Sequence, residues 1–228
     1  MASLKKTSSI SEYQAFIEEL YGISNARFFN VDDMLSNIER FTMRGIKGIR
    51  KGNTQKVVTN LLIASGWFMS LMNQYHIDIE EPIWRRFPHL CSYCGSVPCS
   101  CKKNKVENRL AISIDERKRP KTLKGFQEMF EKIYPSDTRT VEHAGIHLAE
   151  ETGELSEAFL SYKGSHSERD FANIVLESSD FVSCLFGVFN SIKVDFALEL
   201  ALNFAENCNA CKRSPCACTF AEIVAFKS

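Results

Sequence analysis

The chain has 228 residues, and its 28 lysines and arginines balance its 28 aspartates and glutamates. A net charge of zero argues against a molecule that is held as a whole on nucleic acid or on a membrane surface. A hydrophobic content of 44% with 17 phenylalanines fits an ordinary globular protein. The N-terminal residues lack an apolar signal segment, and the longest apolar stretches are interrupted by polar residues, so we expect a cytoplasmic protein with no membrane partner.

Helical patterns follow one another along the chain. Apolar side chains recur at spacings of three and four, which is the period of an amphipathic helix. In chain order, this spacing predicts helices near residues 13–21, 31–43, 55–76, 78–87, 126–134, 139–163, 168–193 and 195–206. Pro135 and Gly164 mark two of the expected helix ends. Because no alternating run is long enough to force a sheet, we expect an all-α fold.

Two cysteine segments repeat one spacing, C-x2-C-x4-C-x-C, at a distance of 117 residues. Their members are Cys91, Cys94, Cys99 and Cys101 in the first segment, and Cys208, Cys211, Cys216 and Cys218 in the second. In a reducing compartment, such grouped thiols are typical of metal sites rather than of disulfides. A closed set of four thiolates predicts one structural Zn²⁺ in each zinc-knuckle-like segment, with an iron–sulfur cluster as the alternative. The ninth cysteine, Cys184, lies in an apolar run and is expected to be buried.

The shared register of the cysteines indicates a tandem duplication. Residues that recur at the same offset are Asn73 as Asn190, Asp78 as Asp195, and Phe87 as Phe204. We therefore expect a first repeat over residues 1–104, a polar and basic linker over 105–122, and a second repeat over 123–228. Trp67 and Trp84 are expected in the core of the first repeat.

Five acidic residues of the second repeat lie on two consecutive predicted helices: Glu150, Glu151, Glu154, Glu177 and Asp180. Residues three apart share a helix face, so Glu151 and Glu154 project together, as do Glu177 and Asp180. Packing of the two helices would direct these four carboxylates into one groove, where they repel one another. A hard divalent cation relieves the repulsion, and oxygen-only ligands favour Mg²⁺ or Mn²⁺ over zinc.

The first repeat lacks these carboxylates. At the cysteine offset of 117 residues, the four ligand positions fall on Met34, Asn37, Asn60 and Ile63, and Glu150 falls on Asp33. A generic solvated face is not expected to lose its charge at all four positions together. We therefore expect a degenerate first repeat and an active site in the second repeat alone.

The sequences HLAEETGELSEAF and LESSDF resemble, in order and setting, the EE-x-x-E and E-x-x-D motifs of the MazG-like nucleotide pyrophosphohydrolases, in the all-α NTP pyrophosphatase superfamily. The resemblance covers residues 123–207 and reaches the first repeat only through the duplication. It implies a tandem pair of MazG-like helical bundles that form a pseudo-dimer within one chain, with further homodimerisation left open. The four-cysteine segments are not part of the family pattern.

The resemblance also implies an activity. Glu151, Glu154, Glu177 and Asp180 would hold Mg²⁺, with Glu150 supporting the site, and a (d)NTP would be hydrolysed to (d)NMP and diphosphate. The residues suit this chemistry, because pyrophosphate release requires neutralised phosphates and an activated water. Glu150 and Glu154 are both candidates for the general base.

Candidate substrate-binding residues lie in both repeats. His147 precedes Glu151 by one turn, and Lys163 follows on the same predicted helix. Arg44 and Lys47 belong to a basic, glycine-containing segment after a first-repeat helix, and we expect them to reach the phosphates from the degenerate repeat. Read simply, that segment is a solvated glycine-rich loop.

Two other classes of function fit parts of the sequence. A duplicated zinc-containing helical protein could use its carboxylates only to sense metal or nucleotide, as a non-catalytic regulatory module. Nucleic-acid binding through the cysteine segments and the basic run 117–121 predicts a salt-dependent affinity. The zero net charge disfavours this second alternative.

Overall fold

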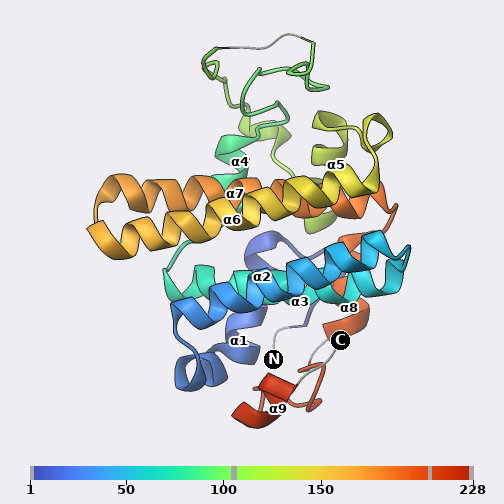
Figure 1. Ribbon diagram of the computed structural model, residues 1–228. Coiled ribbons are helices and arrows are strands. Elements are labelled where there is room, and N and C mark those ends of the chain that lie inside the picture. The colour runs from blue at the N-terminus through green and yellow to red at the C-terminus, as the bar shows by residue number, and fades with distance from the viewer. Residues whose placement is uncertain (1–2, 104–106, 205–206, 226–228) are drawn as a thin grey trace. The chain divides into compact units, whose positions relative to one another are not determined.

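Helices account for the regular structure of the described residues, 3–103, 107–204 and 207–225, of the computed structural model (Figure 1). No strand occurs in these ranges, which confirms the predicted all-α class. The α-helices are α1 (Ile10–Phe28), α2 (Val31–Arg50), α3 (Thr54–Gln74), α4 (Glu80–Arg86), α5 (Leu123–Ile133), α6 (Val141–Ser165), α7 (Glu168–Ser191), α8 (Phe196–Phe204) and α9 (Phe220–Ala225). Short 3₁₀ turns at Glu116–Lys118 and Ser136–Thr138 precede α5 and α6.

Local signals set the ends of the two long helices α6 and α7. The Thr140 hydroxyl accepts a hydrogen bond from the His143 amide at the start of α6, and the Ser167 hydroxyl accepts one from the Asp170 amide at the start of α7. The α6 helix ends at Ser165, one residue after the end predicted at Gly164, and the following residue, His166, has a left-handed φ of 49°. The hairpin of α6 and α7 is therefore fixed at both ends of its connection.

The α2 helix is longer than its sequence pattern predicts. It continues to Arg50, so the basic segment with Arg44 and Lys47 is helical, and its reading as a glycine-rich loop is wrong. Its glycines serve close packing instead. A Cβ on Gly45 would lie 2.7 Å from Leu61 Cδ2 of α3, so the missing side chain lets the two helices approach.

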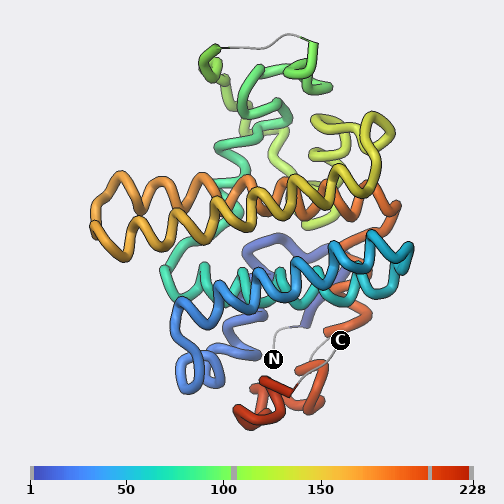
Figure 2. Tube along the Cα trace, viewed as in Figure 1, coloured from blue at the N-terminus to red at the C-terminus, as the bar shows by residue number. Residues whose placement is uncertain are grey.

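The chain divides into two compact units, and each unit contains parts of both sequence repeats. Unit 1 comprises residues 1–78 and 197–228, and unit 2 comprises residues 79–196. The trace passes from α3 of unit 1 into α4 of unit 2, and from α7 of unit 2 into α8 of unit 1 (Figure 2). The repeats have therefore exchanged the segments that follow their helical hairpins, including the cysteine segments.

The exchange decides which core α4 joins. This helix packs on α7, and the Phe87 ring that follows it meets the Phe130 ring edge-on, with centroids 5.1 Å apart. Trp84 is fully buried and donates its indole N–H to a Glu116 carboxylate oxygen at 2.9 Å. Trp84 thus belongs to the core of unit 2, and its expected place among first-repeat core residues is wrong because α4 leaves that repeat.

The two units contain matching hydrogen bonds, as the predicted duplication leads one to expect. In unit 1, the Gln14 amide donates to Asn73 Oδ1 at 2.9 Å and to the Ile77 carbonyl at 2.7 Å. In unit 2, the Gln127 amide donates to Asn190 Oδ1 at 3.0 Å and to the Val194 carbonyl at 2.8 Å. Each asparagine also donates back to the backbone carbonyl of its glutamine. The same buried polar cluster therefore joins α1 to α3 in unit 1 and α5 to α7 in unit 2.

The offset between repeats changes along the chain, which corrects the comparison of α2 with α6. The α3 and α7 helices match at 117 residues, as Asn73 and Asn190 show. The buried residues of α6 match those of α2 only at 110 residues, where Thr152 falls on Thr42 and Leu148 on Ile38. The N-caps Asn30 and Thr140 follow the same offset. The α6 and α7 helices are longer than α2 and α3. The residue offset between the repeats therefore differs before and after the loop that connects the two helices of each hairpin.

The corrected register changes the counterparts of three acidic residues. Glu150 corresponds to Arg40, Glu151 to Phe41 and Glu154 to Arg44, rather than to Asp33, Met34 and Asn37. The counterparts of Glu177 and Asp180 stay Asn60 and Ile63. Unit 1 has no carboxylate at any of the four proposed ligand positions, so the inference of a degenerate copy survives the correction.

The α7 helix is long and apolar enough to cross a membrane by length and composition alone. More than half of its most apolar window is buried in the structure, and the helix carries Glu177 and Asp180. These features are those of a core helix, whose apolar sides contact α4, α5 and α6.

Candidate functional site

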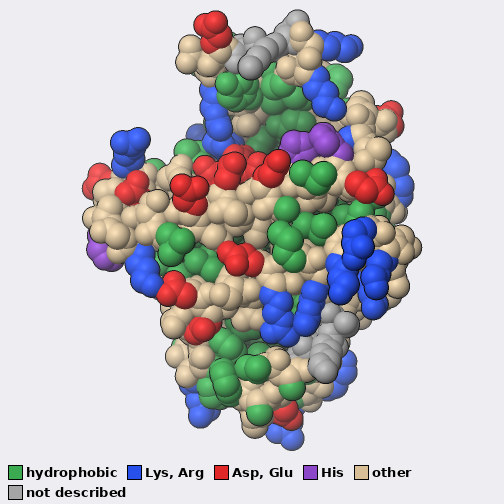
Figure 3. Space-filling view, in the orientation of Figure 1, with side chains coloured by type: hydrophobic (Ala, Val, Ile, Leu, Met, Phe, Trp, Pro, Cys, Tyr) green, Lys and Arg blue, Asp and Glu red, His purple; other side chains and the backbone are tan. Residues whose placement is uncertain are grey.

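One face of α7 carries the side chains of the candidate site. Glu177, Asp180, Cys184 and Gly187 follow one another at spacings of three, four and three residues, which places them on one stripe of the helix. The α6 helix packs against α7 along its length (Figure 1). In the view of Figure 3, acidic side chains form a row along α6.

Three carboxylates converge between these two helices. Oxygens of Glu151 on α6 and of Glu177 and Asp180 on α7 lie within 4.8 Å of one another, and all three side chains are half-buried. Glu154 is exposed and lies outside this tight group, although its charge acts on both Glu151 and Glu177. The site therefore has three close carboxylates and a fourth at its edge.

Burial and repulsion from neighbouring carboxylates make ionisation of Glu151 and Glu177 unfavourable. Burial, followed by repulsion from Asp180, Glu154 and Glu177, raises the pKa of Glu151 to about 8. Burial, followed by repulsion from Asp180 and Glu154, also raises the pKa of Glu177. The cluster consequently favours either a bound proton or a bound cation at neutral pH.

Arg86 supplies a counter-charge that sequence reasoning missed. Its Nε donates to Asp180 Oδ1 at 2.6 Å, and its Nη2 donates to Asp180 Oδ2, with only 7% of the arginine side chain exposed. Burial opposes the charge of Arg86, but the Asp180 hydrogen bond and the nearby Glu177 and Glu151 raise the pKa of the guanidinium. No local pattern marks this residue, since it reaches the site only because α4 crosses into unit 2.

The negative charge of Glu151 and Glu177 is not compensated within the carboxylate cluster, which suits the binding of a divalent cation. Glu151 Oε2 is buried and has no hydrogen-bond partner among the described residues. Arg86 pairs with Asp180, and within the part of the chain that the structure describes no cation lies at hydrogen-bonding distance from Glu151 or Glu177. An oxygen-only donor set with surplus negative charge is typical of a Mg²⁺ or Mn²⁺ site.

His147 lies at the edge of the site rather than in it. Its Nδ1 contacts Glu150 Oε2 at 3.1 Å, and its Nε2 contacts His143 Nε2 at 3.2 Å. Glu150 is exposed and is not part of the tight carboxylate group. Since His147 already orients Glu150, the two act as a pair beside the groove.

The other candidate substrate-binding residues lie elsewhere. Lys163 is exposed in the last turn of α6, about 18 Å from Glu151 along the helix axis at a rise of about 1.5 Å per residue. Arg44 and Lys47 belong to α2 of unit 1, where lysines and arginines gather over the C-terminal end of the helix (Figure 3). The Arg44 guanidinium lies 5.3 Å from the Phe41 ring centroid. A role for these three cations in phosphate binding stays a prediction.

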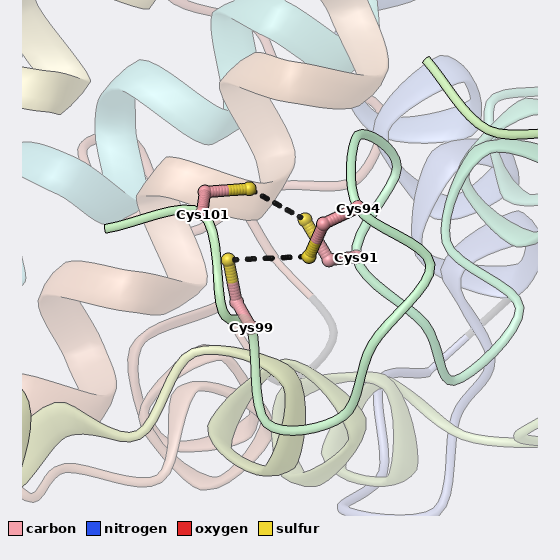
Figure 4. A group of neighbouring side chains, drawn as sticks. All are labelled: Cys91, Cys94, Cys99 and Cys101. Atoms are coloured by element: carbon pink, nitrogen blue, oxygen red, sulfur yellow. Dashed lines mark hydrogen bonds between the residues drawn. The ribbon is translucent and has the colours of Figure 1, made fainter. Parts of the chain in front are cut away.

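The four-cysteine segments each gather their sulfurs as a metal site requires. In the first, Cys91 and Cys101 sulfurs lie 3.8 Å apart and those of Cys94 and Cys99 lie 3.9 Å apart (Figure 4). A tetrahedral zinc with sulfurs at about 2.3 Å has sulfur–sulfur edges of about 3.8 Å. The second segment repeats the arrangement, with 3.8 Å from Cys208 to Cys218. Both segments can therefore hold a zinc ion.

The pKa values of thiols in the first segment are shifted in opposite directions. Burial opposes ionisation of Cys94, but backbone hydrogen bonds to its sulfur outweigh burial and lower its pKa to about 5. Burial raises the pKa of Cys99 and of Cys101. None of the nine cysteines, all within the described ranges, forms a disulfide. Cys184 is half-buried on the α7 stripe, and burial raises the pKa of its thiol.

Each cysteine segment docks on a helix of the unit it joins, α5 in unit 2 and α1 in unit 1. In unit 2, the Cys99 amide donates to the Ile133 carbonyl at 2.8 Å, and the Tyr134 hydroxyl donates to Cys91 Sγ at 3.4 Å. In unit 1, the Cys216 amide donates to the Leu20 carbonyl at 2.8 Å. The four-cysteine segments thus fasten the exchanged parts of the chain to the units that they join.

Unit 1 contains an apolar cavity where unit 2 carries the carboxylates. The cavity has a volume of about 120 Å³, and Phe41, Ile63, Trp67 and Ser70 are among the residues that line it. Their counterparts in unit 2 are Glu151, Asp180, Cys184 and Gly187. The same place in the fold is therefore charged in one unit and apolar in the other.

A scan against protein-family models and searches of curated proteins and of solved structures found no match to this chain.

Proposed function

We propose that the chain is a Mg²⁺- or Mn²⁺-dependent nucleoside triphosphate pyrophosphohydrolase whose active site lies in unit 2. The observation that carries the proposal is the convergence of Glu151, Glu177 and Asp180 within 4.8 Å, with a buried, unpartnered Glu151 oxygen. The order and spacing of the two acidic motifs, which resemble those of MazG-like enzymes, add support.

Glu151, Glu177 and Asp180 would hold the cation, with Glu154 completing the set at the exposed edge. A divalent cation, when bound, neutralises adjacent phosphates and lowers the pKa of a water. The chain's own contribution is to orient the donors. Arg86 donates to both oxygens of Asp180, so that this carboxylate keeps one orientation.

Glu150 is the better placed of the two candidate bases. It is exposed to solvent and contacts His147 at 3.1 Å, which in turn contacts His143. A proton taken from water by Glu150 can pass to His147 and then to solvent. Glu154 is the alternative base. If Glu154 took the proton, His147 and His143 would have no role in proton transfer.

The two zinc ions have a structural role in this proposal. A closed set of four thiolates offers no position for a reacting water. The first site holds the segment that follows Arg86 onto α5 of the same unit. Zinc would thereby help to keep α4, and with it Arg86, in place beside Asp180.

The test is an assay of the full-length protein with Mg²⁺ and each (d)NTP in turn. We expect pyrophosphate and the matching monophosphate in equal amounts. The Glu151→Gln variant should lose at least 100-fold in rate, whereas Glu157→Gln, an exposed acidic residue of the same helix, should keep wild-type activity. Turnover of no nucleotide by the wild-type protein would reject the enzyme and favour the non-catalytic regulatory module.

A further inference from the structure

An arginine lies at the far end of the α7 stripe that carries the carboxylates. The stripe continues from Asp180 through Cys184 to Gly187, and Arg139 packs on this glycine. A Cβ at position 187 would lie 2.6 Å from Arg139 Nη2 and 3.3 Å from its Cζ. The guanidinium therefore lies directly on the bare backbone of α7, at a place that only glycine leaves open.

Arg139 is not neutralised by any carboxylate. It takes part in no ion pair and no hydrogen bond within the described ranges, and its Nε is buried. Buried polar groups in folded proteins nearly always have partners, and a charged one without a partner is costly. Arg139 is thus a cation held ready for an acceptor that the chain itself does not provide.

The equivalent place in unit 1 is occupied by aromatic rings. At the register of α2 and α6, Arg139 corresponds to Phe29, and Cys184 corresponds to Trp67. Phe29 and Trp67 meet edge-on with centroids 4.9 Å apart, beside the cavity of about 120 Å³. The fold therefore accommodates flat rings here, and unit 2 has replaced an indole with a thiol at the same level.

We infer that Arg139 is a specificity-determining residue that recognises the base of a nucleoside triphosphate. The inference rests on the proposed function, in which Glu151, Glu177 and Asp180 hold the phosphates through a cation. Gly187 follows Asp180 by seven residues, which is about 10 Å along the helix axis. The arginine thus faces the part of the substrate that lies beyond the phosphates.

The chemistry of the site favours a base over a terminal phosphate. An arginine fork pairs in the plane of a base with neighbouring carbonyl and ring-nitrogen acceptors, as in its pairing with guanine O6 and N7. Gly187 is buried beneath the guanidinium and Cys184 is half-buried, and neither brings a second positive charge of the kind that a phosphate would favour. A hydroxyl of the Thr140 N-cap is already used by the His143 amide and does not compete for the arginine.

The experiment compares kcat/KM for ATP, GTP, CTP and UTP among variants of the full-length protein. Arg139→Ala should reduce the ratio between the best and the worst base by about tenfold or more, because a two-pronged contact to a base discriminates by that order. Arg139→Lys, which keeps the charge but not the fork, should lose selectivity to a similar degree. Gly187→Ala should also reduce base selectivity, because the added methyl group displaces the guanidinium although residue 139 is still arginine.

Arg169→Ala is the matched control, since it removes one positive charge from an exposed position in the first turn of the same helix. It should leave base selectivity unchanged. Selectivity that survives in both Arg139→Ala and Gly187→Ala would overturn the inference, as would an equal rise in KM for all four nucleotides, which would place the arginine on a phosphate. If the wild-type protein hydrolyses none of the four, the proposed function itself fails, and the assignment of Arg139 fails with it.

Discussion

Arg86 and Asp180 lie 94 residues apart in the sequence and meet as a two-armed ion pair inside unit 2. The arginine ends α4, which the first repeat contributes, and the aspartate lies on α7 of the second repeat. Their counterparts in unit 1 are Asn203 and Ile63, so unit 1 has neither member of the pair at these positions. The pair thus belongs to the candidate site rather than to the common fold.

Replacement of Arg86 by alanine should destabilise the protein by about 3 kcal/mol, because it leaves a buried carboxylate without its partner. The measurement is urea unfolding at pH 7, followed with and without Asp180→Asn. The double variant should recover part of the loss, since the unpaired charge is then gone. Arg85→Ala, which removes a largely exposed neighbouring arginine, should leave the unfolding midpoint unchanged. An equal decrease in the free energy of unfolding in Arg86→Ala and Arg85→Ala would show that the Arg86–Asp180 pair does not stabilise the protein more than a surface arginine does.

The raised pKa of Glu151 predicts how stability varies with pH in metal-free protein. A carboxyl whose folded pKa lies near 8, above its unfolded value of 4.5, keeps its proton longer in the folded state. The folded state is therefore favoured at low pH and loses that advantage as the pH rises from about 4.5 to about 8. Thermal unfolding in a chelating buffer should show this decline, and Glu151→Gln should flatten it.

Addition of Mn²⁺ should reverse the decline. The cation must displace a proton from Glu151 at pH 6 but not at pH 8.5, so the rise in Tm should be larger at the higher pH. Glu151→Gln should show almost no rise at either pH, and Glu157→Gln should behave as the wild type. A rise in Tm that is larger at pH 6 than at pH 8.5 would contradict the assignment of the cation to Glu151.

The two cysteine segments should differ in their effect on the candidate site. Elemental analysis should find two zinc ions per chain, and one after Cys91→Ser or Cys208→Ser. Loss of the first zinc loosens the segment that follows Arg86, so Cys91→Ser should lower the affinity for Mn²⁺ and the rate of hydrolysis by tenfold or more. Cys208→Ser, in unit 1, should affect both much less. Iron in place of zinc in the purified protein would identify the segments as iron–sulfur sites.

The buried polar cluster of each unit offers a further comparison. Gln14→Ala and Gln127→Ala each leave an asparagine and a carbonyl without their partner, which costs roughly 1–3 kcal/mol. We expect losses of similar size, because the hydrogen bonds of the two glutamines match within 0.1 Å. Urea unfolding of both variants is the measurement. A large loss in only one of them would show that the repeats no longer share this contact.

Local periodicity predicted most of the fold and part of the candidate site. A spacing of three residues on a helix is enough to place Glu177 beside Asp180, because the helical period fixes which side chains share a face. The four-cysteine segments were equally readable, since all the ligands of one site lie within a few residues of one another. Such features depend only on neighbours in the sequence.

The features that sequence reasoning missed depend on distant contacts. Arg86 reaches Asp180 because the repeats exchange α4, and no local pattern signals that crossing. The wrong register of α2 had a readable signal, since Asn30 and Thr140 are matching N-caps at an offset of 110 residues. The length of the α2 helix was missed because Gly45 is a loop signal in sequence but a packing residue when Leu61 lies opposite.

The exchange of segments between the repeats means that the chain cannot be cut into two independent halves at its linker. A fragment of residues 1–104 would carry α4 and the first zinc segment without the helices on which they dock, and a fragment of residues 123–228 would carry α8 and the second segment in the same condition. When the two fragments are expressed together, we expect them to associate, because each carries a segment that packs in the unit formed mainly by the other. We therefore expect the two halves to depend on each other for folding, so that the half without the carboxylates would still be needed by the half that carries them.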